Sequence, residues 1–297
     1  MKSSAKSPVK APAAPVREGE RIAKRLARAG LCSRRDAERW IAEGRVKVDG
    51  EVLATPACVV TDKNVIEVDG KPLPQAERAR VWRYHKPPSE MVTARDPEGR
   101  RTIFDALPKS MPRVVTIGRL DFMSEGLLLL TNDGGLARQL ELPANGWTRR
   151  YRARVHGTVD EGKLAELKRG ITIEGVNYGP IEASLDRLQR SNAWIDIALS
   201  EGKNREVRRV LAHLELPVVR LIRVAFGPFT LGELQRGMVE EVPAMALAAT
   251  LGGGKPVRGE GWAKPKPRPP QHHRAKRKPG EKNSPNTKNS KSHRLQS

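Results

Sequence analysis

The sequence has 297 residues, with 55 Lys and Arg against 34 Asp and Glu, and a formal net charge of +21. So basic a balance is typical of proteins that bind nucleic acids. Cys32 and Cys58 are the only cysteines, which excludes a disulfide-rich secreted scaffold and a four-cysteine metal site. No apolar run approaches the ~20 residues that span a bilayer, and the first residues lack the apolar core of a signal peptide. We therefore expect a cytoplasmic protein that does not associate with membranes.

Most of the positive charge lies at the two ends. Residues 1–17 carry four basic and no acidic side chains, and residues 253–297 carry thirteen basic and two acidic ones, so the ends hold 15 of the 21 net charges. Both ends are rich in Pro, Lys, Ser and Gly, and this composition predicts disordered tails over 1–17 and 252–297. The tails either add a sequence-independent attraction to phosphates or only improve solubility.

Residues 18–73 predict a small module of two helices on a small sheet. Apolar residues recur at helical spacing from Ile22, and Ser33, three residues before Asp36, predicts the N-cap of a second helix. The segment 46–53 alternates apolar and polar residues around Asp49 and Gly50, the strongest short signal for a β-hairpin. A second strand followed by Asp-Gly occurs at 65–70.

The helical half of this module is unusually basic. Nine basic and three acidic residues lie between 21 and 47, although 18–70 as a whole is neutral. A solvated helix face is one explanation of such a charge run. The segment 21–53, RIAKRLARAGLCSRRDAERWIAEGRVKVDGEVL, also closely resembles the S4 RNA-binding domain. The resemblance implies that Arg34, Arg35, Arg39 and Lys47 face an RNA backbone, whose shape rather than base sequence is read.

A polar linker over 74–80 leads to a larger domain over 81–251. Strands are predicted over 81–84, 113–117, 127–131, 150–156, 195–198 and 218–224, and helices over 135–142, 160–169 and 205–214. Helices join only some of these strands, which favours an α+β fold with a mixed, mostly antiparallel sheet over a repeating βαβ barrel. The domain contains no GxGxxG, P-loop, HExxH or GxSxG motif.

One aspartate of this domain stands between two glycines. Segment 118–135 reads GRLDFMSEGLLLLTNDGG, so Asp121 precedes a four-leucine strand. A turn aspartate that only caps its loop is the structural interpretation. The string also resembles motif II of the pseudouridine synthases, and the resemblance implies that Asp121 is the catalytic residue.

Three more pieces of the same family pattern occur along the chain in the family's order. Segments 84–88 (YHKPP), 95–100 and 104–108 resemble the N-terminal motif, 150–155 (RYRARV) resembles the strand with the family's tyrosine, and 201–209 (EGKNREVRR) resembles motif III. With the S4 module the pattern covers about 18–248 and is similar to the small, S4-bearing rRNA pseudouridine synthases that act on single sites. The basic C-terminal tail favours the members that act on large-subunit 23S rRNA over those that act on small-subunit 16S rRNA.

Helical geometry selects one arginine of motif III. Val207, Val210, Leu211 and Leu214 form an apolar stripe, with Arg205 and Arg209 opposite it and Arg208 at its edge. Only Arg208 can lean inward. The family resemblance assigns it to an ion pair with the catalytic aspartate, which would keep that carboxylate ionised in spite of burial. The alternative is an arginine that only extends from the edge of a core to solvent.

The implied reaction, isomerisation of uridine to pseudouridine, requires no cofactor, metal or second substrate, and a monomer is expected. Asp121 acts either as a nucleophile or as a base that lets a glycal form, and the sequence leaves both open. The uridine must be flipped out of its stack. Tyr151 matches the aromatic residue that stacks on it, with a sheet-core tyrosine as the alternative. The implied RNA-binding residues of the large domain are Lys86, Arg119, Lys203 and Arg205, the two lysines having plain surface positions as the alternative.

The sequence departs from the family pattern in two places. Phe122 and Met123 replace the pair that usually follows the aspartate, and Ser89, Glu90 and Met91 stand where Gly-Val or Gly-x-Val is usual. These changes affect the expected pocket lining and hence the choice of uridine. Two other classes compete with the enzyme hypothesis: a non-catalytic rRNA-binding or ribosome-assembly factor, and another S4-bearing enzyme such as a tyrosyl-tRNA synthetase.

Overall fold

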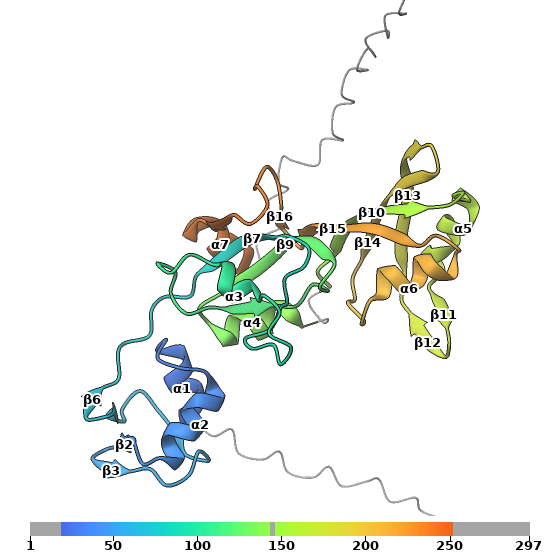
Figure 1. The fold of residues 1–297 in the computed structure, drawn as a ribbon. Helices are drawn as coiled ribbons and strands as arrows, with labels where there is room; N and C mark the ends of the chain where they lie inside the picture. The colour runs from blue at the N-terminus through green and yellow to red at the C-terminus, as the bar shows by residue number, and fades with distance from the viewer. Residues whose placement is uncertain (1–18, 143–145, 252–297) are drawn as a thin grey trace, which may run out of the picture. The chain divides into compact units, whose positions relative to one another are not determined.

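The computed structural model describes residues 19–142 and 146–251 (Figure 1). The tails predicted over 1–17 and 252–297 lie outside the described residues. The N-terminal module consists of β1 (Glu20–Arg21), α1 (Ile22–Arg28), α2 (Arg34–Ala42), β2 (Val46–Val48), β3 (Glu51–Val52), β4 (Val59–Val60), β5 (Ile66–Val68) and β6 (Lys71–Pro72). The strands form an antiparallel sheet in the order β3-β2-β5-β6 and a separate β1-β4 pair. The prediction of two helices on a small sheet is confirmed.

Local signals account for the ends of these elements. The Ser33 hydroxyl accepts a hydrogen bond from Asp36 N, and the Asp36 carboxylate accepts one from Ser33 N, so a complete capping box begins α2. Asp49 and Gly50 have φ values of 53° and 88°, the left-handed conformations that a two-residue hairpin turn requires. The apolar faces of both helices pack on the sheet around Ile22, Leu26, Ala37, Ile41 and Val46.

The C-terminal module contains a nine-stranded sheet. Its elements are β7 (Val81–Lys86), α3 (Ile103–Ala106), β8 (Val115–Ile117), β9 (Ser124–Thr131), α4 (Gly134–Glu141), β10 (Arg149–His156), α5 (Glu161–Glu166), η2 (Leu167–Arg169), β11 (Ile171–Ile173), β12 (Val176–Tyr178), β13 (Ile181–Gln189), β14 (Asn192–Leu199), α6 (Glu206–His213), β15 (Val218–Phe226), β16 (Phe229–Thr230), β17 (Val239–Glu241) and α7 (Ala244–Leu251). The strand order is β13-β14-β10-β15-β9-β7-β17, with β16 beside β15 and β8 beside β9. Only the β15-β9 pair is parallel among the described pairs, so the sheet is mixed and mostly antiparallel, as predicted.

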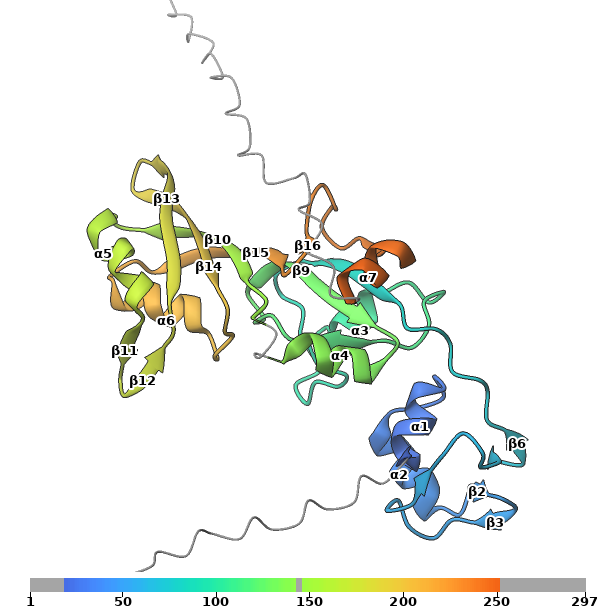
Figure 2. The same cartoon turned by 180° about the vertical axis from the view of Figure 1, so that it is seen from behind.

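The two halves of this sheet are packed differently. In the half formed by β13, β14, β10 and β15, one face packs on α5, α6 and the β11-β12 hairpin, which lie together in both views (Figures 1 and 2). In the other half both faces are covered, and every residue of β9 is buried. The two halves meet where β9 and β15 pair, and the site residues predicted from the sequence lie near this junction.

Candidate active site

Asp121 lies in the loop between β8 and β9. Leu120 before it is buried, Ser124 N donates to the Asp121 carbonyl oxygen at 3.0 Å, and Ser124 itself is buried. The loop is therefore anchored on both sides of Asp121, while the carboxylate remains 30% exposed. A carboxylate in this position is fixed in place and still accessible to a substrate.

Arg208 reaches this carboxylate from α6. Its Nε lies 3.8 Å from Asp121 Oδ2, and its side chain is 14% exposed. Its terminal nitrogens donate to the carbonyl oxygens of Val218 (3.2 Å) and Met123 (3.3 Å) and to the Ser124 hydroxyl (3.4 Å). Burial lowers the pKa of Arg208, and the charge of Asp121 opposes that shift. The structure thus brings together the two groups of the predicted ion pair, and carbonyl oxygens of the loop (Met123) and of β15 (Val218) orient the arginine.

The start of α6 depends on a buried carboxyl group. Glu206 Oε2 accepts a hydrogen bond from Lys203 N at 2.8 Å, and only 3% of Glu206 is exposed. Burial raises the pKa of Glu206 to about 7. Arg205, just before the helix, adopts a left-handed conformation with φ of 51°. These contacts fix the first turn of α6, two residues before Arg208.

Tyr151 lies on β10 at the meeting point of the two sheet halves. It is half-buried and packs both against the core under α6 and against the cluster that contains Leu120, the neighbour of Asp121. On β15 it is in register with Arg223, which is 2% exposed and donates to the carbonyl oxygen of Leu127 at 2.7 Å. Burial lowers the pKa of Arg223, and Tyr151 opposes that shift. Arg223 is not among the residues predicted from the sequence, where its signal is a charged residue among apolar neighbours in a strand.

The prediction that Lys86 binds RNA is wrong. Lys86 is fully buried, and its Nζ donates to the carbonyl oxygens of Pro87 (2.9 Å), Phe122 (3.2 Å) and Ser124 (2.9 Å). Burial lowers its pKa to about 8. An ammonium group enclosed by three carbonyl oxygens has no donor to offer a phosphate, so Lys86 instead holds the loop that carries Asp121.

The remaining predicted cations are at the surface. Arg119 and Arg205 are exposed, and Lys203 is exposed but ion-paired with Glu201. In the S4 module Arg34, Arg35 and Lys47 are exposed. Arg39 is exposed too, and its guanidinium lies 3.2 Å from Asp36 and 3.7 Å from Glu43. Arg34, Arg35 and Lys47 are thus the S4 cations most available to a phosphate.

The two departures from the family pattern are in contact with each other. Ser89 N donates to the Phe122 carbonyl oxygen at 2.8 Å, and Ser89 Oγ lies 3.9 Å from Met123 Sδ. Glu90 is buried and accepts a hydrogen bond from the Tyr84 hydroxyl at 2.6 Å. Met123 is 57% exposed beside Asp121. Ser89, Phe122 and Met123 therefore form one surface next to the candidate site, which the sequence could not show.

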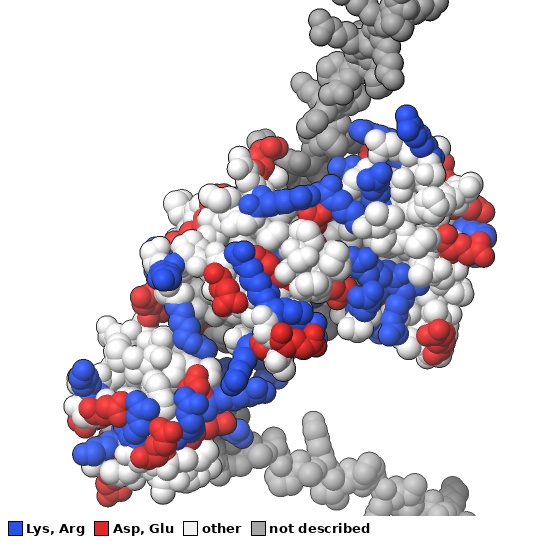
Figure 3. Space-filling model, viewed as in Figure 1, with Lys and Arg blue, Asp and Glu red and all other residues white. Residues whose placement is uncertain are grey.

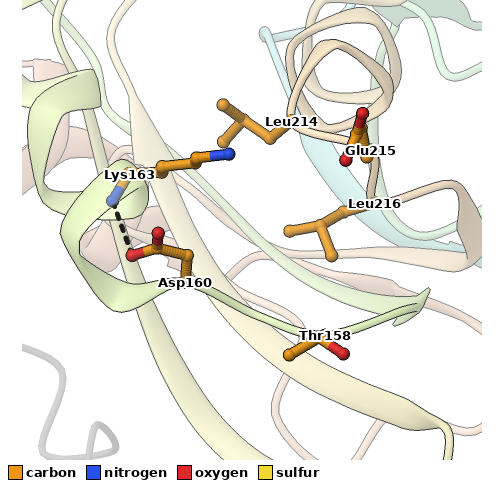
Figure 4. Close-up of a pocket in the computed structure, with 6 residues that line it drawn as sticks. All are labelled: Thr158, Asp160, Lys163, Leu214, Glu215 and Leu216. Carbon is orange, nitrogen blue, oxygen red and sulfur yellow. Dashed lines mark hydrogen bonds between the residues drawn. The ribbon is translucent and has the colours of Figure 1, made fainter.

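Other features of the described residues are unrelated to this pair. A hollow of about 230 Å³ is lined by Thr158, Asp160, Lys163 and the 214–216 turn, and Asp160 there accepts a hydrogen bond from Lys163 N (Figure 4). None of the predicted site residues lines it. Within 19–142 and 146–251, no group of three or more His, Cys, Asp or Glu residues is arranged to hold a metal ion. No helix in those ranges is both long and apolar enough to span a membrane.

Two family models match the chain: the S4 domain over residues 20–66 and RNA pseudouridylate synthase over residues 80–213. An uncharacterized RNA pseudouridine synthase of Rickettsia felis is 45% identical over 223 residues, which cover 75% of this chain and 96% of that protein. The ribosomal large subunit pseudouridine synthase B of Haemophilus influenzae is 41% identical over 248 residues, covering 81% of this chain and 70% of that protein. A solved pseudouridylate synthase structure matches with a TM-score of 0.53 and 25% identity, covering 75% of this chain and 96% of that one.

Proposed function

The chain belongs to the RNA pseudouridine synthase family, and from that premise we propose that it converts one uridine of large-subunit 23S rRNA to pseudouridine, with Asp121 as the catalytic residue. The observation that carries the catalytic assignment is the Asp121–Arg208 pair, a partly exposed carboxylate beside an oriented cation. The large-subunit assignment is supported by relatives named ribosomal large subunit pseudouridine synthase B, at 41% to 43% identity.

The reaction breaks the N1–C1′ bond of uridine and forms a C5–C1′ bond. The proton that C5 loses is balanced by the proton that N1 gains, so the product is an isomer of the substrate. Asp121 either attacks the nucleotide and forms a covalent intermediate or removes a ribose proton to give a glycal. In both routes the carboxylate acts in its ionised form, and Arg208 places a positive charge beside it.

Tyr151 is the residue that we propose stacks on the uracil. A uridine within structured RNA must leave its stack to reach Asp121, and an aromatic ring offers a face for the extruded base. Tyr151 suits this role because it is half-buried and packs against the cluster that contains Leu120. Its hydroxyl end interacts with the buried Arg223, which would fix the tilt of the ring.

The exposed cations would hold the RNA around this site. Arg119 and Arg205 are the candidates in the catalytic module, and Arg34, Arg35, Arg39 and Lys47 those in the S4 module. The planar guanidinium group of arginine suits phosphate oxygens because it can donate two parallel hydrogen bonds. Asp121 and its neighbours would carry out the chemistry, and the exposed cations of both modules would hold the RNA.

The proposal is tested by mapping pseudouridines in both rRNAs of cells that lack the gene. Wild-type protein should restore one large-subunit site, and Asp121→Asn, which removes the charge but little volume, should not. Asp160→Asn is the matched control, because asparagine caps a helix as well as the native residue does. Recovery of the modification by Asp121→Asn would refute the catalytic assignment, and loss of a 16S site would refute the choice of rRNA.

A further inference from the structure

One face of the sheet half formed by β13, β14, β10 and β15 is open to solvent. Side chains of a strand alternate between faces, and Tyr151, Ala153 and Val155 pack in the core under α6. Arg152 and Arg154 therefore lie on the opposite face. Because Arg208 projects from α6, this second face is on the other side of the sheet from the Asp121–Arg208 pair.

A row of basic residues crosses the open face. Arg187 on β13 is in register with Trp194 on β14, Trp194 with Arg154 on β10, and Arg154 with Arg220 on β15. Neighbouring strands are about 4.8 Å apart, so the row is roughly 14 Å long. In Figure 3, Lys and Arg side chains gather along the edge of the molecule that holds β10, β13 and β15. We call Arg154, Arg187 and Arg220 the open arginine face.

The tryptophan organises the arginines around it. The guanidinium carbons of Arg152 and Arg220 lie 5.1 and 5.8 Å from the Trp194 ring centroid. Arg152 is also paired with Asp186 and, at 3.3 Å, with Asp196. Arg220 is paired with Glu125, so acidic neighbours already compensate these two charges. Trp194 thus has two guanidinium groups close to its ring and is not a bare apolar anchor for a protein partner.

The other two charges of the row are not compensated. Within the part of the chain that the structure describes, neither Arg154 nor Arg187 forms an ion pair, and the buried Arg154 Nε has no hydrogen-bond acceptor. Like charges directly opposite each other on paired strands destabilise a sheet, and Arg154 faces Arg220 in this way. An anion bound over the row would reduce that repulsion.

We propose that the open arginine face binds the phosphate backbone of a second RNA segment, separate from the segment whose uridine reaches Asp121. The row is too long for a single phosphate ion and matches a polyanion, and guanidinium forks suit its phosphate oxygens. The identity of the polyanion rests on the proposed function, because RNA is the polyanion that this enzyme encounters. The face would thereby orient the enzyme on a large rRNA without taking part in the reaction.

The test compares the double variant Arg154→Gln/Arg187→Gln with the wild type. The RNAs are a full large-subunit rRNA transcript and a short stem-loop that carries the modified uridine. Binding to the transcript should weaken by about 3- to 10-fold, and the slope of log affinity against log salt should fall by about 1 to 2, since each phosphate contact contributes roughly 0.9 on duplex DNA. Binding to the stem-loop and its single-turnover rate should not change.

Lys168→Gln/Arg169→Gln is the matched control. It removes the same charge from exposed residues of η2, on the helix-covered side of the same sheet half. Equal losses in the two variants would overturn the proposal in favour of diffuse attraction. Weakened binding of the stem-loop would also overturn it, because the defect would then reach the catalytic side.

Three further readouts separate the alternatives. The melting temperature of the double variant should be unchanged or higher, because repulsion is removed; a clear decrease would indicate a merely structural role. Normal transcript binding with lost co-sedimentation on large-subunit particles would assign the face to a ribosomal protein and overturn the RNA assignment. Absence of pseudouridine formation by the wild type would refute the proposed function. RNA binding by the open arginine face could still be measured in that case, so the two proposals are tested separately.

Discussion

Lys86 Nζ lies 2.9 Å from the carbonyl oxygen of Ser124, a contact that ties β7 to the loop carrying Asp121. The same ammonium group binds the Phe122 carbonyl oxygen at 3.2 Å, and that oxygen also accepts the hydrogen bond from Ser89 N. A fully buried lysine is costly unless its donors are satisfied, and here three carbonyl oxygens satisfy them. Lys86 is therefore a positioning residue for Asp121.

The first prediction concerns this contact. Lys86→Met keeps the length of the side chain but leaves buried carbonyl oxygens unpaired, at a cost of about 1 to 3 kcal/mol in the free energy of unfolding. The loop at Asp121 should loosen, so the single-turnover rate should fall while RNA affinity stays nearly constant. Chemical denaturation and single-turnover assays measure the two effects. Lys109→Met, at an exposed position, is the control. A Lys86→Met enzyme with lower RNA affinity and a normal rate would show that Lys86 binds RNA and does not position Asp121.

The second prediction separates Arg208 from its helix neighbours. Arg208→Lys keeps a cation but loses the planar fork that contacts Val218, Met123 and Ser124, so Asp121 would face a poorly oriented charge. We expect the single-turnover rate to fall by about 10- to 100-fold. Arg209→Lys, on the exposed side of the same helix, should change it little. Equal losses of single-turnover rate in the two variants would show that the orientation of the Arg208 guanidinium group does not determine the rate.

The third prediction concerns the pH dependence of stability. The folded-state pKa of Glu206, about 7, lies above its ordinary value of 4.5. The unfolded chain therefore releases this proton first as the pH rises, and the Glu206 contribution to the free energy of unfolding decreases between these values. Glu206→Gln stays neutral and still accepts from Lys203 N. It should raise the free energy of unfolding at pH 8 by about 1 to 3 kcal/mol, and with it the melting temperature. At pH 4 it should change both little.

Thermal unfolding across this pH range measures the effect. Glu166→Gln, at an exposed position, is the control and should show no such difference between the two pH values. An equal stabilisation by Glu206→Gln at both pH values would show that the protonation of Glu206 is not responsible.

The fourth prediction divides the basic regions by salt dependence. Deleting 253–297, with its net charge of +11, should weaken binding to every RNA and flatten the salt dependence without changing which uridine is modified. Replacing Arg34, Arg35 and Arg39 by Gln should instead reduce the preference for the natural rRNA fragment over an unstructured RNA of equal length. Binding of both RNAs at several salt concentrations distinguishes the two. Loss of discrimination on tail deletion alone would reverse this division.

Local sequence patterns predicted most of the elements correctly. The Ser33 cap, the Asp49-Gly50 turn and the strands at β7, β9, β10 and β15 follow from contacts within a few residues or from apolar periodicity. The β13 strand was missed because its second half, exposed throughout, lacks a clear alternation. The position of Arg208 was predictable because a helix repeats its face every few residues, and the structure shows Arg208 directed to Asp121.

What the sequence determined by itself, then, is most of the longer strands and helices, the helix face that carries Arg208 and the motifs that mark the family. Only the tertiary structure shows that Lys86 is buried, that Arg223 lies beside Tyr151 on the neighbouring strand, and that Ser89 binds Phe122. Each of these depends on partners far apart in the chain, such as the carbonyl oxygens 36 and 38 residues from Lys86. Charged side chains are normally exposed, and only a fold that assembles enough acceptors around one can bury it.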